Sequence, residues 1–418
     1  MATRRHTPRG RGFDQSLIYY EHKNDYWDQT LLQSKCQKYN PIVDLWGDDN
    51  AGHEGPAREL NGTAYEEYML RDRVLSIIAA HDAARPLFLV YTPHVAHCPL
   101  QVPPDWLARF NASDDEKDCQ QQTTYIFPGS ERRDYRCRNQ YRAMVALLDA
   151  ALGNITDALK AKGMWQDTLM VLSSDNGGPV DTAESGATNF PLRGGKYSDW
   201  EGGIRVAAFA SGGFLPAAAR GTTNDGIVHI ADWYGTYATL AGVDPTDAAA
   251  AAAGLPPVDS VNVWPLVSRA NLTSPRAEIP VGPNVLIQGR YKLITNRMIE
   301  ATWGGPNYPN GSSVASPVDP GPTMNCTANG GCLFDVVADY TEHTDIAAQN
   351  PAVVKSMTAR LAELVKGYYS NSDDFTATSV CPQNMGNVTP CGCWAALNVW
   401  GGFFGPWAWG QNSSSALN

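Results

Sequence analysis

Apolar positions in the first part of the chain alternate between helical periodicity and short continuous runs. They recur at helical spacing from 65 to 83 and again from 140 to 162, where Gly163 ends the pattern. The runs 87–91 and 168–172 show no polar alternation, which predicts strands that are buried on both faces. A strand, a helix and a second strand in this order favour a parallel sheet with helices on its faces.

The connection between the first predicted strand and its helix is unusually long. It spans nearly fifty residues, so we expect it to be functional or to carry an insertion. Its distal part, 111–139, contains two cysteines, which we expect to form a disulfide within the insertion. Further along, 203–210 is a third strand candidate and 230–240 is a predicted helix. The alanines at 248–253 predict a surface loop or a single helical turn.

After about residue 270 the pattern changes to short apolar runs separated by Gly, Pro and Asn. The runs 285–287, 290–295 and 332–337 predict a small antiparallel sheet. A helix follows, capped by Asn350 and with Pro351 at its first position. Its predicted buried stripe consists of Val353, Val354, Met357, Leu361, Leu364 and Val365. The tail has no regular pattern, and its Cys, Gly and Trp content indicates disulfides and aromatic packing.

Composition narrows the class of protein. The chain has 418 residues and is 43% hydrophobic, so it can bury a large core and is neither disordered nor fibrous. Its net charge of −11 includes no long single-sign block, which argues against nucleic acid as the main partner. No run approaches the roughly twenty apolar residues that a membrane span needs.

Cysteines and glycosylation sequons point to the secretory pathway, with a lysosomal or extracellular destination. The chain has nine cysteines and eight Asn-x-Ser/Thr sequons. The sequons are at Asn61, Asn111, Asn154, Asn271, Asn310, Asn325, Asn387 and Asn412. The residues after Met1 have no apolar core and cannot be a signal peptide. Either the sequons are chance, or the amino terminus of the whole protein is missing.

Polar side chains follow both predicted strands, at the edge where open parallel sheets bind ligands. The first strand leads into a loop with His94 and His97, and the second leads into Asp175 and Asn176. A carboxylate beside a carboxamide offers two hard oxygen donors, which suit Ca²⁺ or Mg²⁺ better than zinc. Each feature alone has a plainer interpretation: an Asp-Asn-Gly-Gly turn, a loop histidine and, for Lys196, a surface loop.

Several motifs occur together in a fixed order along the chain. They are Arg11-Gly12-Phe13-Asp14, Pro86-Leu87-Phe88-Leu89, His97-x-Pro99-Leu100-Gln101-Val102-Pro103, Ser174-Asp175-Asn176-Gly177-Gly178, Pro191-Leu192-Arg193-Gly194-x-Lys196, Trp200-Glu201-Gly202-Gly203-x-Arg205, His229-Ile230-x-Asp232-Trp233, Leu333-Phe334-Asp335, Trp400-Gly401 and Gly405-Pro406-Trp407. With them the chain resembles a sulfatase of the arylsulfatase type, closest to the arylsulfatase B group of the alkaline phosphatase superfamily. The resemblance implies an α/β fold with a mixed, mostly parallel sheet flanked by helices and incomplete at the N-terminus. It places a catalytic domain at 1–270 and a smaller α+β subdomain at 271–418.

The resemblance also implies a chemistry, the hydrolysis of aryl or carbohydrate sulfate esters with a divalent metal. Sulfatases hold the metal, usually Ca²⁺ with Mg²⁺ as the alternative, through three aspartates and an asparagine, and Asp175 and Asn176 match the second pair. They bind sulfate through lysine and histidine side chains, which His97 and Lys196 match. His97 would donate a proton to the leaving oxygen, and Lys196 would bridge this oxygen and a sulfate oxygen. His94 would line the substrate pocket, although a structural role in the loop fits it equally well.

The departures from the family pattern matter as much as the matches. The family's nucleophile is a formylglycine made from Cys/Ser-x-Pro-x-Arg, and this motif does not occur in the chain. The Asp-Asp pair of the family's first strand and its Gly-Lys-Trp motif are absent too, so we interpret Met1 as an internal methionine of a truncated sulfatase. We expect the chain as written to fold poorly and to be inactive, because missing strands would leave sheet edges uncovered. Well-folded, active protein would contradict this.

Two other functions stay open at this point. One is a secreted, non-catalytic glycoprotein that binds sulfated polysaccharide on a sulfatase scaffold. The other is a superfamily relative that cleaves phosphodiesters or phosphonates, which the lysine and histidine motifs disfavour. The expected partner is a sulfated small molecule or polysaccharide. Spacing does not fix the disulfides, and the pairs we favour are Cys119 with Cys137 and Cys326 with Cys332.

Overall fold

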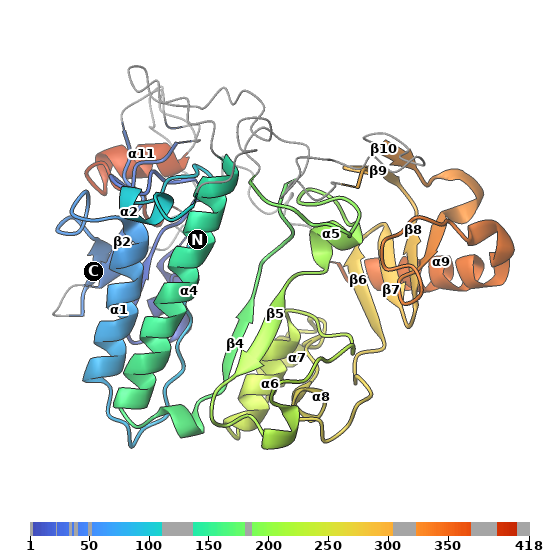
Figure 1. Ribbon diagram of the computed structural model, residues 1–418, viewed down its shortest axis with the longest axis horizontal. Helices are drawn as coiled ribbons and strands as arrows, with labels where there is room; N and C mark the ends of the chain where they lie inside the picture. The colour runs from blue at the N-terminus through green and yellow to red at the C-terminus, as the bar shows by residue number, and fades with distance from the viewer. Residues whose placement is uncertain are drawn as a thin grey trace. The chain divides into compact units, whose positions relative to one another are not determined.

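The computed structural model describes most of the chain (Figure 1). The described residues are 3–21, 23–32, 36, 41–48, 52–110, 137–179, 186–303, 323–368 and 391–407. The chain divides into two compact units, and each is described by itself. The first unit comprises residues 1–163 and 370–418, and the second comprises 164–369. The domain boundary expected at residue 270 stays a prediction.

Two long helices, both predicted from their apolar spacing, dominate the first unit. Helices α1 (Glu66–Ala80) and α4 (Cys137–Ala161) pack side by side (Figure 1). Their buried residues include Met69, Val74 and Ile78 on α1, and Met144 and Leu147 on α4. The other elements of this unit are η1 (Arg4–His6), η2 (Arg9–Arg11), β1 (Leu17–Ile18), β2 (Trp46–Asp48), β3 (Glu54–Pro56), α2 (Pro104–Leu107) and α11 (Cys391–Asn398). Strands β1, β2 and β3 form an antiparallel sheet in that order.

The strand predicted at 87–91 does not form. These residues pair with no strand in the described part of the chain, and Phe88 and Val90 are 60% and 55% exposed. An apolar run becomes a buried strand only where other strands satisfy its backbone groups, and the run itself does not encode those partners. The interpretation of 87–91 as a strand buried on both faces is therefore wrong.

The predicted α/β class is confirmed, but the described residues contain no parallel strand pair of the kind that we expected. The run at 168–172 does form a strand, β4 (Met170–Ser173), which pairs antiparallel with β5 (Ala208–Ser211). Every strand pair in the described residues is antiparallel. Strand β5 begins later than predicted, because the residues before it fold into the short helix α5 (Glu201–Ile204).

The second unit is built around the small antiparallel sheet that the sequence predicts. Its strands run in the order β11 (Cys332–Asp335), β8 (Tyr291–Ile294), β7 (Val285–Gln288) and β6 (Glu278–Gly282). Successive residues of β7, β8 and β11 point to opposite buried faces. On one face, α9 (Pro351–Val365) covers Leu286, Leu293 and Leu333. On the other face, Val285, Ile294 and Phe334 pack against Trp200, so the sheet anchors the segment that carries this tryptophan.

The remaining elements of the second unit are short. They are η3 (Trp165–Asp167), η4 (Ala217–Ala219), α6 (Asp232–Leu240), α7 (Ala248–Ala252), α8 (Trp264–Val267), β9 (Arg297–Ile299), β10 (Thr323–Asn325), η5 (Ala328–Gly330) and η6 (Ala347–Gln349). Helix α6 confirms the prediction for 230–240, and α7 shows that the alanine run is helical. Asn350 occupies the N-cap position of α9 as predicted, but its side chain makes no capping hydrogen bond. Its Nδ2 donates to the Ile346 carbonyl at 2.9 Å.

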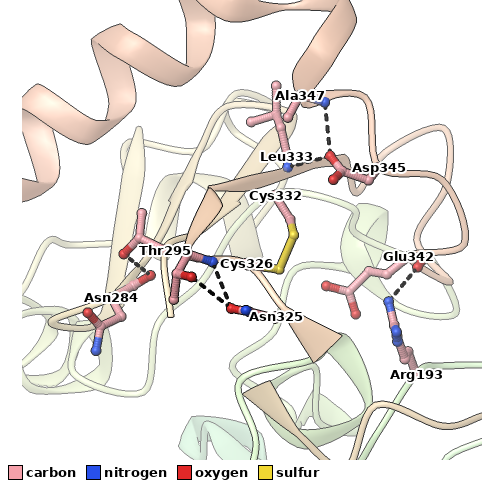
Figure 2. The surroundings of a disulfide bond; sticks show 11 residues. Arg193, Asn284, Thr295, Asn325, Cys326, Cys332, Leu333, Glu342, Asp345 and Ala347 are labelled. Atoms are coloured by element: carbon pink, nitrogen blue, oxygen red, sulfur yellow. Dashed lines mark hydrogen bonds between the residues drawn. A yellow bond between two sulfur atoms is a disulfide. The ribbon is translucent and has the colours of Figure 1, made fainter. Parts of the chain in front are cut away.

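Two disulfides lie among the described residues. Cys326–Cys332 is confirmed and ties the residue after β10 to the first residue of β11 (Figure 2). Cys36–Cys393 was not predicted, and it fixes helix α11 in a tail that we expected to be irregular. The predicted Cys119–Cys137 pair falls outside the residues whose side chains the structure describes.

Candidate active site

His97 lies half-buried in the loop that follows residue 91 in the first unit. Its Nδ1 lies 2.8 Å from the carbonyl oxygen of Cys98. A carbonyl only accepts hydrogen bonds, so Nδ1 carries the hydrogen and Nε2 is the nitrogen that can exchange a proton. This geometry fits His97 for the predicted role of a proton donor.

His94 shares the loop with His97, at 5.9 Å between ring centroids, but its environment differs. It is 3% exposed, its Nδ1 lies 2.9 Å from Glu66 Oε1, and its ring stacks on Tyr26. Burial raises the pKa of Glu66 to about 8. The second glutamate of α1, Glu67, accepts the backbone N–H groups of His94 and of the next residue. These contacts fasten the loop to the first turn of α1.

A second set of hydrogen bonds fixes the other end of the same loop. The hydroxyl of Tyr26 donates to the His97 carbonyl at 3.0 Å, and its backbone N–H donates to Gln101 Oε1 at 2.8 Å. The Tyr65 hydroxyl donates to the Gln101 carbonyl at 2.8 Å. The position of His97 is thus set by side chains from several separate segments of the first unit.

Asp175 and Asn176 lie in a turn directly after β4, in the second unit. Asp175 Oδ1 accepts the Asn176 N–H at 2.8 Å, and Asn176 Nδ2 donates to the Gly177 carbonyl at 2.8 Å. The turn passes close to the backbone of α5, and a Cβ on Gly177 would lie 1.7 Å from the Gly202 oxygen. Only glycine fits at Gly177, which explains the glycine after the Asp-Asn pair.

The structure brings Lys196 into the same part of the second unit. The Lys196 N–H donates to the Gly178 carbonyl at 3.1 Å. This hydrogen bond joins the loop that carries Lys196, here called the lysine loop, to the Asp175–Asn176 turn. Gly194, two residues before the lysine, has a φ of +66°, and a Cβ there would lie 2.6 Å from Trp200 Cδ1. Lys196, Asp175 and Asn176 therefore form one group, whereas His94 and His97 form another in the first unit.

Buried charged side chains stabilise the loop that carries Lys196. The Arg193 guanidinium lies 3.8 Å from the ring centroid of Trp200 and donates to the Ala301 carbonyl. It also donates to the Glu342 carbonyl (Figure 2). Fully buried Lys292 lies 2.8 Å from Glu342 Oε1 and 3.1 Å from Glu201 Oε1. Burial raises the pKa of Glu342 to about 7, although the charge of Lys292 opposes the shift.

Known proteins are similar to this chain in sequence and in fold. A family model described as Sulfatase matches residues 1–243. The chain belongs to the sulfatase family. It is 30% identical to arylsulfatase J of Mus musculus over 98% of this chain and 63% of the relative. It is also 30% identical to arylsulfatase A of Homo sapiens, over 38% of this chain and 25% of the relative.

Solved structures confirm the alkaline-phosphatase-like fold class. The structure of Ps i-CgsB in complex with k-i-k-neocarrahexaose matches with a TM-score of 0.61 and 22% identity, over 88% of this chain and 70% of that chain. The PsFucS1 sulfatase from Pseudoalteromonas sp. matches with a TM-score of 0.55 and 20% identity, over 78% and 59%. The chain thus spans less than two thirds of mouse arylsulfatase J but most of the Ps i-CgsB fold.

The donor set for a sulfatase metal is incomplete in the described residues. Asp175 is exposed, and its carboxylate and the Asn176 carboxamide supply oxygens of the kind that Ca²⁺ and Mg²⁺ prefer. In these residues, however, no cluster of three or more His, Cys, Asp or Glu side chains is placed to hold a metal. Ca²⁺ takes about six to eight oxygen ligands, so the two donors do not by themselves fit the ion.

Sequence reasoning found the sulfatase motifs but missed the residues that hold them. Glu66 and Glu67 look like ordinary first-turn acids of a helix, and Lys292 looks like a strand residue facing solvent. Asn189 stands outside every quoted motif, two residues before Pro191. The sequence motif assigns no role to Glu201, and the structure places it beside Lys292. For Asn189 and Glu201, the available sequence signal was that each is a polar residue in or beside a motif and has no assigned role.

Proposed function

We propose that this protein is a sulfuric ester hydrolase of the arylsulfatase type that acts on aryl or carbohydrate sulfate esters. Charge grows on the leaving oxygen as the S–O bond breaks, so a cation and a proton donor aimed at this oxygen stabilise the transition state. Lys196 supplies the cation for a sulfate oxygen and the leaving oxygen. His97 supplies the proton from Nε2. The main support for this role is the contact between His97 Nδ1 and the Cys98 carbonyl, which leaves Nε2 as the nitrogen that exchanges the proton. In this proposal His94 holds the loop and does not contact the substrate.

Two parts of a sulfatase centre are not assigned to residues of this chain. Asp175 and Asn176 remain proposed donors to Ca²⁺ or Mg²⁺, but no step is derived through the metal because the donor set is incomplete. No Cys/Ser-x-Pro-x-Arg motif occurs in the 418 residues, so no residue is assigned as the nucleophile. We therefore expect these residues alone to bind a sulfate ester without turning it over.

The second candidate, a secreted glycoprotein that binds sulfated polysaccharide, is favoured by the same missing nucleophile motif. The disulfides Cys36–Cys393 and Cys326–Cys332 support the proposed passage through the secretory pathway. Among the described sequons, Asn154, Asn271 and Asn325 are exposed. None of the described helices is long and apolar enough to cross a membrane.

Titration with 4-nitrophenyl sulfate, followed by calorimetry, tests the proposed site. We expect saturable binding that weakens about tenfold in Lys196→Ala, because one charge-assisted hydrogen bond contributes about 1.5–3 kcal/mol. Lys366→Ala, which removes an exposed lysine of the second unit, is the matched control. Equal affinity of the wild type and Lys196→Ala would contradict the assignment. Binding of a sulfated oligosaccharide but not of the aryl ester would favour the second candidate.

A further inference from the structure

The side chain of Asn189 lies between the two loops of the proposed site in the second unit. Its Oδ1 accepts the Gly178 N–H at 2.9 Å. Its Nδ2 donates to the Gly178 carbonyl at 2.7 Å and to the Gly194 carbonyl at 3.0 Å. One carboxamide thus bonds the turn that carries Asp175 and Asn176 and also the loop that carries Lys196.

The backbone around Asn189 closes these contacts into a network. The Gly178 carbonyl that accepts from Asn189 also accepts the Lys196 N–H at 3.1 Å. The Gly177 N–H donates to the Gly203 carbonyl at 2.9 Å, and a Cβ on Gly178 would lie 2.1 Å from Ala187 Cβ. The turn is therefore packed too closely to move without breaking these bonds.

The chemistry of the contacts selects a carboxamide. Asn189 accepts one hydrogen bond and donates two, and both donated bonds end on carbonyl oxygens. A carboxylate has no hydrogen to donate at neutral pH. It would place its negative charge against two carbonyl oxygens, which carry partial negative charge, and would form no hydrogen bond with them. Alanine would leave two carbonyls and one N–H of a half-buried turn without this partner.

We propose that Asn189 is a positioning residue that fixes the distance between the Asp175–Asn176 turn and Lys196. It does not touch the substrate and acts through the backbone of both loops. The inference rests on the proposed function for its consequence in sulfate binding, but the ordering of the loops is independent of any ligand.

Hydrogen exchange measured by mass spectrometry tests the positioning directly. In Asn189→Ala and Asn189→Asp, we expect the Gly178 and Lys196 amides to exchange about tenfold faster, as expected for a loss of about 1.4 kcal/mol of local stability. Peptides from β7 and β8 should exchange as in the wild type. Asn224→Ala is the matched control, because Asn224 also donates to one backbone carbonyl and accepts one backbone N–H, away from the two loops.

Binding of 4-nitrophenyl sulfate provides the second readout. We expect both Asn189 variants to bind about tenfold more weakly than the wild type and Asn224→Ala to bind normally. Unchanged exchange at Gly178 and Lys196 would overturn the role of Asn189, whatever the affinity. If the wild type does not bind the probe, the proposed function fails, and the exchange rates still decide whether Asn189 orders the two loops.

Discussion

Glu66, the first residue of α1, forms a buried pair with His94, and the protonation of Glu66 bears on the stability of the first unit. Their facing atoms lie 2.9 Å apart, and both side chains are almost fully buried. Burial is the main cause that raises the pKa of Glu66 to about 8, of Glu67 to about 7 and of Asp44 to about 7. The folded protein therefore holds protons that the unfolded chain releases.

The resulting prediction concerns stability against pH. Glu66 titrates near 4.5 in the unfolded chain and at about 8 in the folded protein. Its contribution is complete below the lower value and is lost as the pH rises toward the upper one. We expect Glu66→Gln to reduce the fall in unfolding free energy between pH 5 and 8 by up to about 1.4 kcal/mol per pH unit. Urea unfolding across this range measures it.

A matched variant separates this effect from the general pH dependence. Asp72→Asn also removes a carboxylate from α1, but the Asp72 side chain is 61% exposed. It should leave the pH dependence as in the wild type. An equally steep fall in Glu66→Gln would show that Glu66 does not hold the extra proton.

At the scale of single residues, the sequence predicts the residues that carry chemistry better than the residues that position them. His97, Asp175, Asn176 and Lys196 stand in motifs that a family resemblance identifies. The role of Asn189 depends on three hydrogen bonds to backbone groups, and no side-chain pattern encodes them. Burial of His94 depends in the same way on the remote α1.

Several of the correctly predicted elements have a signal that is local in sequence. The hairpin of β7 and β8 and the amphipathic helices α1, α4 and α9 need only local periodicity or a short turn. The run 87–91 needs strands from elsewhere to become a buried strand. In the described residues it has none, so periodicity alone gave the wrong element.

Helix α9 offers an element-scale test of the sheet that anchors the lysine loop. Leu361 is 4% exposed and packs with residues of β7, β8 and β11. We expect Leu361→Ala to destabilise the second unit by about 3 kcal/mol, because it removes buried methyl groups and leaves a cavity. Lys355→Ala, on the exposed side of the same helix, should stay within about 0.5 kcal/mol. Urea-unfolding midpoints that shift equally in both would contradict the packing of α9 on the sheet.

At the scale of the whole molecule, the first unit is assembled from sequence at both ends of the chain. Cys36 and Cys393 join segments that are 357 residues apart, and Trp46 packs edge-on against Trp400. The Val43 N–H donates to the Gly402 carbonyl at 2.9 Å, which adds a backbone link between the same segments. The unit therefore depends on the tail being in place, and cysteine spacing could not reveal this.

The two described disulfides should differ in how much they stabilise the fold. In the chain-entropy account, a crosslink stabilises by restricting the unfolded chain, and the effect grows with the length of the closed loop. Cys36–Cys393 spans 357 residues and Cys326–Cys332 spans six. We expect the double variant Cys36→Ser with Cys393→Ser to lose about 6 kcal/mol. The matched pair Cys326→Ser with Cys332→Ser should lose about 2 kcal/mol.

Hydrogen exchange can assign each loss to its unit. Removing Cys36–Cys393 should speed exchange in α11 and in the residues around Val43, because the tail would separate from the segment that it covers. Removing Cys326–Cys332 should affect β10 and the start of β11 and leave the first unit protected. Equal losses for the two double variants would mean that native contacts around each bridge, and not loop length, set its contribution. A larger loss for the long loop than for the short one is the outcome that the chain-entropy account requires.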